Sequence, residues 1–69
     1  MTIILVEVRP HSRAESTYAD AGEARGRLDE AISHFARVFG NVFVWVEMDE
    51  LHNAMRVYVS CREREAVAS

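Results

Sequence analysis

Residues 28–48 have the sequence LDEAISHFARVFGNVFVWVEM, and the spacing of their apolar residues changes at Gly40. Before this glycine, apolar side chains recur every three or four residues, which places them on one face of a helix. After it, valines occupy every second position from Val42 to Val46, which is typical of a strand. Gly40 stands where a helix commonly ends in a left-handed residue. The stretch therefore predicts an amphipathic helix followed directly by a β-strand.

The helical pattern extends towards the N-terminus through Ala24 and Ala21. Asp20, with Glu23 three residues later, resembles a capping box in which Asp replaces Ser or Thr. Thr17 with Asp20 is an alternative start one turn earlier. We therefore expect a helix over about residues 18–39. Its outer face has the charge spacing of a solvated helical surface. The pairs on that face are Glu23 with Arg27, Arg25 with Asp29, and Glu30 with His34.

Two more strands are predicted, one before the helix and one at the end of the unit. Residues 2–9 are rich in Ile, Leu and Val, and Pro10 ends the strand because proline cannot donate to a sheet ladder. Residues 54–61 alternate apolar and polar side chains. They follow the strand at residues 41–48 after a turn, so these two strands are expected to form a hairpin.

The predicted fold class is α+β, a single domain over residues 1–69. It is a β-α-β-β unit in which one amphipathic helix packs on one face of a three-stranded sheet that contains the hairpin. Residues 11–17 are expected to form a polar connection whose second half could already be helical, and residues 62–69 a frayed tail. The strand order stays open. The polar third strand suits an edge, whereas a ferredoxin-like arrangement would place it in the centre.

One helix covers only one face of such a sheet and leaves the other face uncovered. We assign the regular aliphatic positions to the helix side, namely Ile4, Val6, Val8, Val42, Val44, Val46, Val57 and Val59. The opposite face then carries Ile3, Leu5, Phe43, Trp45 and Tyr58. Monomeric proteins seldom expose so large an apolar patch, and Trp and Tyr are enriched at binding hot spots. The patch predicts an interface with a second copy, with another protein, or with the chain's own ends.

Charge limits the classes of partner. The 69 residues include 11 acidic and 8 basic side chains, all of the latter arginine, for a formal net charge of −3. A general nucleic-acid binder needs a basic surface for phosphates, so direct nucleic-acid binding, including base stacking on the aromatic face, is disfavoured. No apolar run approaches the length of a membrane span, and no basic stretch precedes an apolar one as in a signal peptide. We expect a cytoplasmic protein without a membrane partner.

An acidic cluster lies at the end of the second predicted strand and in the hairpin turn. It contains Glu47, Asp49 and Glu50, and Glu23, Asp29 and Glu30 on the helix would add to it. Acidic surfaces accelerate association with basic proteins, whereas buried aromatic residues contribute most of the affinity. The cluster predicts contact with another protein that has a basic surface. The alternative is an ordinary polar turn.

Few residues are suited to catalysis or to binding a metal or cofactor. Cys61 is the single cysteine, so no intrachain disulfide forms, and free cysteine is most often a small buried residue. The alternative is a reactive thiol assisted by a histidine. His11, His34 and His52 lack the spacing of a metal site, and no glycine-rich phosphate loop is present. We expect no catalytic residues, metal or cofactor, and no enzymatic activity.

In size, acidity, scarcity of cysteine and single-domain α/β organisation, the chain resembles the small phage-encoded anti-CRISPR proteins. The resemblance covers the whole chain and lies in these general properties. It implies a non-enzymatic inhibitor, in the cytoplasm of a bacterial host, that blocks the basic nucleic-acid-binding or recruitment surface of a CRISPR effector. The residues themselves also allow a homodimeric structural or regulatory domain with the aromatic face as its interface.

Overall fold

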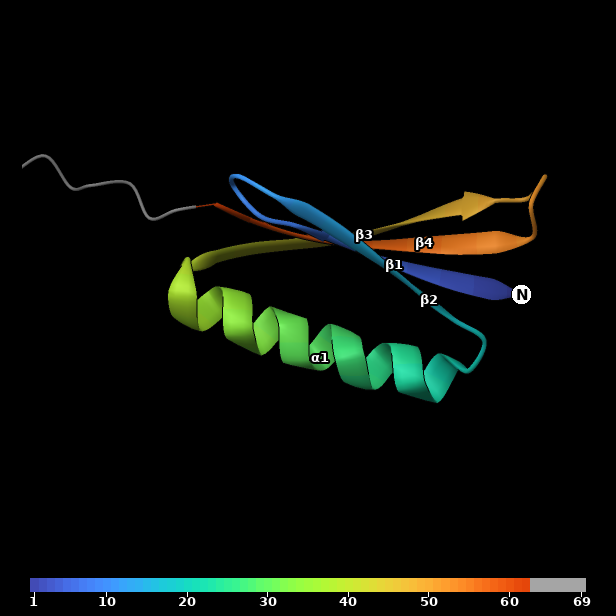
Figure 1. Cartoon of the computed structure of the whole chain (residues 1–69), viewed down its shortest axis with the longest axis horizontal. Helices are drawn as coiled ribbons and strands as arrows, with labels where there is room; N and C mark the ends of the chain where they lie inside the picture. Colours follow the sequence, from blue (N-terminus) through green and yellow to red (C-terminus); the bar gives the residue numbers. More distant parts are fainter. Residues whose placement is uncertain (63–69) are drawn as a thin grey trace, which may run out of the picture.

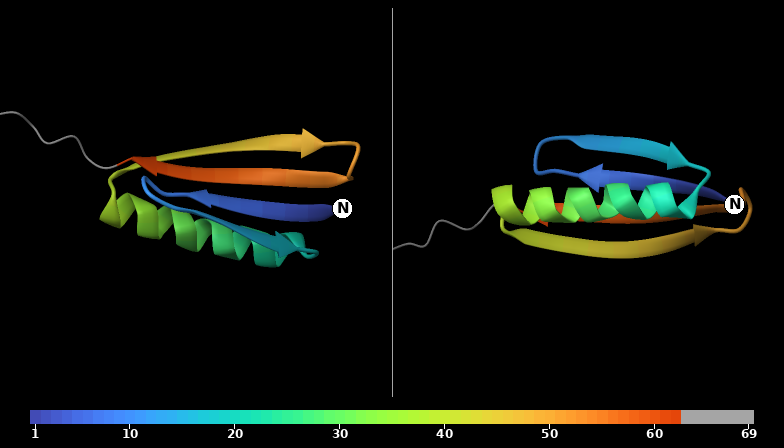
Figure 2. Two further views of the ribbon diagram at one scale, coloured as in Figure 1. Left: turned by 45° about the horizontal axis from the view of Figure 1, so that its top comes forward. Right: turned by 90° about the horizontal axis from the view of Figure 1, so that it is seen from below.

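Two β-hairpins joined by a helix make up residues 1–62, the part of the chain that this computed structural model describes (Figure 1). The elements are β1 (Thr2–Val8), β2 (Arg13–Tyr18), α1 (Ala21–Val38), β3 (Asn41–Asp49) and β4 (Ala54–Arg62). They form one mixed sheet in the order β2-β1-β4-β3, with α1 along one face (Figure 2). The predicted α+β class with a single helix is confirmed. Within residues 1–62, no helix has the length and apolar character needed to cross a membrane.

The sheet has four strands, so the prediction of three strands is wrong. The missed strand is β2, whose sequence RAESTY is too polar to stand out as a strand. It pairs antiparallel with β1, from Ile3 opposite Tyr18 to Val8 opposite Arg13. Backbone pairing defines an edge strand of this kind, so it needs few apolar side chains. Because Tyr18 belongs to β2, α1 begins at Ala21, later than the predicted start.

β4 lies in the centre of the sheet, which settles the open question of strand order. It pairs parallel with β1 and antiparallel with β3. Val57, Val59 and Cys61 are buried on one face of β4, while its polar residues point to the other face. β4 is therefore polar on one face and apolar on the other, which is compatible with a central position. β4 includes Arg62, and the remainder of the predicted tail, residues 63–69, lies outside the described part of the chain.

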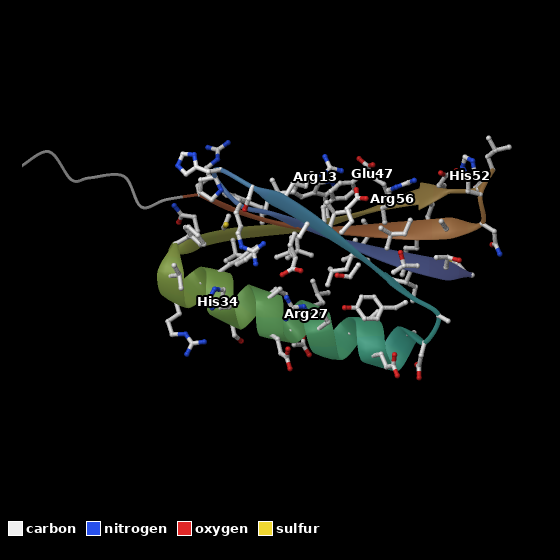
Figure 3. All side chains as sticks on the ribbon, in the orientation of Figure 1. Arg13, Arg27, His34, Glu47, His52 and Arg56 are labelled. Carbon is white, nitrogen blue, oxygen red and sulfur yellow. The ribbon has the colours of Figure 1, made fainter. Side chains whose placement is uncertain are left out.

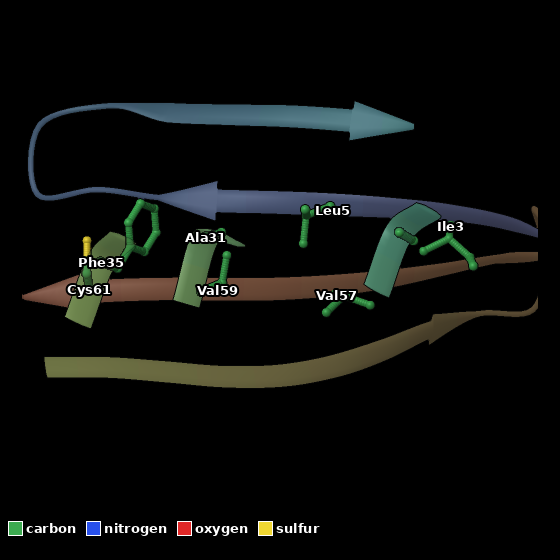
Figure 4. Close-up of a cluster of buried hydrophobic side chains, with 8 residues drawn as sticks. Ile3, Leu5, Ala31, Phe35, Val57, Val59 and Cys61 are labelled. Carbon is green, nitrogen blue, oxygen red and sulfur yellow. The ribbon is translucent and has the colours of Figure 1, made fainter. Parts of the chain in front are cut away.

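The assignment of β1 side chains to the two faces is wrong by one residue. Ile3 and Leu5 are buried in the core beneath α1, together with Phe35, Val57 and Val59 (Figure 4). Ile4, Val6 and Val8 therefore lie on the opposite face. Both faces of this strand are apolar, so alternation alone cannot determine which set faces the helix. Glu7 distinguishes the two faces of β1, because its side chain lies on the helix side and accepts a hydrogen bond from Arg27 of α1.

The ends of α1 follow the sequence signals. The side chain of Asp20 accepts a hydrogen bond of 2.8 Å from the backbone N–H of Gly22, as expected of an N-cap. At the other end, Gly40 has a φ of 98°, and its N–H donates to the carbonyl of Phe35. This left-handed residue ends the helix and directs the chain into β3. The predicted cap and the predicted terminating glycine are both confirmed.

Candidate interaction surface along β3

β3 forms one edge of the sheet and exposes large apolar side chains on both faces. Five of its side chains are between 43% and 56% exposed, namely Phe43, Val44, Trp45, Val46 and Met48. α1 lies over the central strands and leaves the outer side of β3 uncovered (Figure 2). Alternate residues of an edge strand direct their backbone N–H and C=O groups away from the sheet. A long apolar edge of this kind is a template for pairing with another strand.

β2, at the opposite edge, has a different composition. It is shorter than β3, and its two charged side chains, Arg13 and Glu15, form an ion pair of 3.2 Å in its first half. β3 also has two charged side chains, Glu47 and Asp49, but they lie near its C-terminal end and leave residues 42–46 entirely apolar. Charged side chains on an edge strand discourage pairing with other chains. Of the two edges of this sheet, β3 therefore has the composition of a strand that pairs, and β2 has the composition of one that does not.

An apolar cavity of about 280 Å³ lies beside β3, between the sheet and the N-terminal half of α1. Val44 and Val46 border it on the β3 side, and Ala24 and Leu28 border it on the helix side. The small side chain of Ala24 leaves space that a larger residue would fill. The helix face of β3 is therefore incompletely covered by the chain's own helix.

The opposite face of the sheet carries the three aromatic side chains expected there, Phe43 and Trp45 on β3 and Tyr58 on β4. Trp45 lies across from Tyr58, and their rings stack with centroids 5.0 Å apart and planes only 3° from parallel. The guanidinium of Arg62 lies over the ring of Phe43, 5.7 Å from its centroid. Phe43, Trp45 and Tyr58 thus share one face as predicted. Ile3 and Leu5, predicted to join them, are buried under α1 and add nothing to this surface.

The six predicted acidic residues do not form one surface. Glu47 lies on the face away from α1, and Glu50 lies in the hairpin turn (Figure 3). Asp49 is held by Arg56 and His52. The other three, Glu23, Asp29 and Glu30, belong to α1 on the far side of the sheet. Within residues 1–62, Glu47 and Glu50 make no ion pair, although Glu47 lies directly across from Arg56 in the β3–β4 ladder.

Asp49 closes the β3–β4 hairpin through its carboxylate. Arg56 Nη1 donates to Oδ2 at 2.8 Å, His52 Nδ1 lies 2.8 Å from the same oxygen, and the His52 N–H donates to Oδ1 at 3.2 Å. Hydrogen bonds from Arg56 and then His52 lower the pKa of Asp49 from 3.8 to about 2. They also fix the turn, in which Asn53 adopts a positive φ of 47°.

The lowered pKa of Asp49 predicts a loss of stability in acid. A group whose pKa is lower in the folded state stabilises the fold above its unfolded pKa, here 3.8, and the gain disappears as the pH falls through about 2. We expect the melting temperature of the wild type to exceed that of Asp49→Asn above about pH 4. The difference should shrink steadily towards pH 2. Circular dichroism melts of both proteins measure it, and a difference that stays constant over this range contradicts the prediction.

Cys61 is a buried residue of the core, as the preferred prediction stated. Its Sγ donates to the carbonyl of Val8 at 3.4 Å, and burial raises the pKa of the thiol. A buried thiol with a raised pKa is a poor nucleophile. In the described part of the chain, no three His, Cys, Asp or Glu side chains gather in a way that could hold a metal ion.

A buried ion-pair network connects β1 to α1, and little in the pattern of residues indicated it. Glu7 is only 3% exposed, and Arg27 Nη2 donates to both of its carboxylate oxygens, at 3.1 and 3.3 Å. Arg9 lies 3.5 Å from the same carboxylate and stacks over the ring of Phe35. The assignment of Arg27 to the solvated outer face of the helix is therefore wrong. The one available signal was Glu7 itself, a charge within an apolar strand.

No model of a protein family matches the chain, and neither the curated proteins nor the solved structures contain a match. The exposed edge of β3 is therefore the feature from which we infer a function.

Proposed function

We propose that this chain is a non-enzymatic protein-binding module that binds its partner along β3. The observation that carries the proposal is the exposed apolar edge of β3, in a sheet whose other edge is charged. A strand that joins such an edge gains main-chain hydrogen bonds along its length, while alternate side chains select the partner. Aromatic residues such as Phe43 and Trp45 are enriched in the core of interfaces.

The narrower expectation, an inhibitor that blocks the basic surface of a CRISPR effector, stays a prediction. Its support now lies in Glu47 on β3 and Glu50 in the turn that follows, which make no ion pair within residues 1–62. Charges at the rim of an interface act mainly on the association rate. In this function they would guide a basic partner towards the apolar edge.

Site-specific photo-crosslinking tests whether β3 is the binding element. The photoreactive residue benzoylphenylalanine is placed at Val46 on β3, or at Thr17 on β2 as the matched control at the other exposed edge. Irradiation of cells that express each variant should give a crosslinked adduct from position 46 and none from position 17. The further change Val44→Lys should remove the adduct, because a lysine on an edge strand opposes pairing.

Circular dichroism establishes that each variant is folded before the adducts are compared. Absence of an adduct from position 46 in a folded variant would overturn the proposal. Equal adducts from both edges would also overturn it, since β3 would then be no more than one accessible strand among others.

A further inference from the structure

We infer that the partner of β3 is β3 of a second copy of this chain, paired antiparallel about a two-fold axis through Trp45. The inference rests on the proposed function, because it names the partner of the same edge. Pairing of this kind joins two four-stranded sheets into one continuous sheet of eight strands. Two-fold dimers are the commonest oligomers, and their interfaces must be complementary to themselves. β3 meets that requirement on both faces.

The register follows from the position of Trp45 at the midpoint of β3, Asn41–Asp49. An axis at this residue lets all nine residues of each strand pair. On the helix face, Val44 then lies opposite the partner's Val46, and Val42 lies opposite the partner's Met48. Both are apolar pairs, which stabilise an antiparallel ladder. Val44, Val46 and Met48, each about half exposed in the single chain, become covered.

The other face supplies charge complementarity. The same axis places the partner's Glu47 directly opposite Phe43, and the guanidinium of Arg62 already lies over that ring at 5.7 Å. Glu47 and Arg62 make no ion pair within residues 1–62. Pairing therefore brings together two opposite charges, although Arg62 already stacks over Phe43 and Glu47 lies across from Arg56 in its own chain, and the two-fold axis repeats the contact. No like-charged side chains lie directly opposite each other in this register, because Asp49 falls opposite the partner's Asn41.

The position of α1 and the net charge are both compatible with this pairing. α1 lies over the central strands, so a second copy that joins at β3 meets no helix in the plane of the sheet (Figure 2). The two helices lie on the same face, with the two β3 strands between them. Each chain carries a net charge of −3, yet the Debye length is about 8 Å at physiological ionic strength. The local contacts between Glu47 and Arg62 therefore outweigh repulsion between distant acidic groups.

A charge-swap series tests both the partner and the register. Sedimentation equilibrium of the purified full chain should give a monomer–dimer equilibrium for the wild type. Glu47→Arg or Arg62→Glu alone turns two ion pairs into two like-charge contacts, which should raise the dissociation constant about tenfold. The double variant Glu47→Arg/Arg62→Glu should restore wild-type association. Glu15→Arg, the same reversal on β2, is the matched control and should leave the dissociation constant unchanged.

The outcomes separate this inference from the proposed function. A wild type that stays monomeric at all concentrations overturns the second copy as partner. So does a dimer that is indifferent to the single reversals, or a double variant that does not recover. The crosslinked adduct from Val46 then decides the proposed function independently. An adduct with twice the mass of the chain supports the dimer, whereas an adduct of another mass retains β3 as the binding element and rejects the second copy.

Discussion

Replacing Phe35 by alanine is expected to lower the free energy of unfolding by about 3–5 kcal/mol, a large fraction of the total. Phe35 is fully buried and is the largest such side chain of the core, where it packs edge-on against Phe39. Removing a buried phenylalanine ring costs about 3–5 kcal/mol, through lost burial and the cavity left behind. A domain of this size has a total stability of about 3–10 kcal/mol. The expected loss is therefore a large fraction of the total free energy of unfolding.

Urea unfolding of the two proteins, followed by circular dichroism, measures the effect of Phe35→Ala. Phe39→Ala is the matched control, because it deletes the same atoms from a ring that is only partly buried. We expect the control to remain folded and to lose less stability than Phe35→Ala. Equal losses at the two positions would mean that the side of α1 bearing Phe35 does not form the centre of the core.

The second large effect is expected in the network of Glu7, Arg27 and Arg9. Arg27→Met leaves the buried carboxylate of Glu7 with Arg9 alone, at 3.5 Å. Breaking a fully buried pair costs about 3–5 kcal/mol, but Arg27 is 42% exposed and Arg9 remains, so we expect about 2 kcal/mol. The double variant Glu7→Met/Arg27→Met removes the buried charge as well. It should lie within about 1 kcal/mol of the wild type, because apolar residues of similar volume replace buried ion pairs well.

Urea unfolding of the two single variants and the double variant gives the coupling between Glu7 and Arg27. Arg37→Met provides the control, since it makes the same change in the exposed last turn of α1, where it should shift stability by less than about 0.5 kcal/mol. A double variant as unstable as the sum of the single variants would show that the two side chains act independently.

The parts of the fold that the sequence predicted are those determined by local signals. Asp20 and Gly40 marked the ends of the helix, and the alternation on either side of the turn marked the second hairpin. Two features depended on pairing between distant segments and could not be predicted this way. The first is β2, which is defined by its backbone hydrogen bonds to β1. The second is the face of the sheet on which Ile3 and Leu5 lie, which follows from the pairing of Glu7 with Arg27 on the helix side.

The candidate surface was also predicted only in part. The aromatic residues of β3 were recognised as exposed because one helix cannot cover two faces of a sheet. Their position at an edge was not recognised, because a three-stranded prediction does not determine which strand is outermost. Only the observed order, with β4 between β1 and β3, turns an apolar face into an apolar edge with unpaired backbone groups.

The central position of β1 and β4 also determines when this protein can fold. Thr2 pairs with Ala54 and Val8 with Ser60, so each of these pairs joins residues 52 positions apart. Contacts over such separations form late, because the closure of a long loop comes before the gain from packing. During synthesis, the apolar residues of β1 must wait until β4 has left the ribosome. The two hairpins and the helix can form earlier, and they acquire their common core in one late, cooperative step.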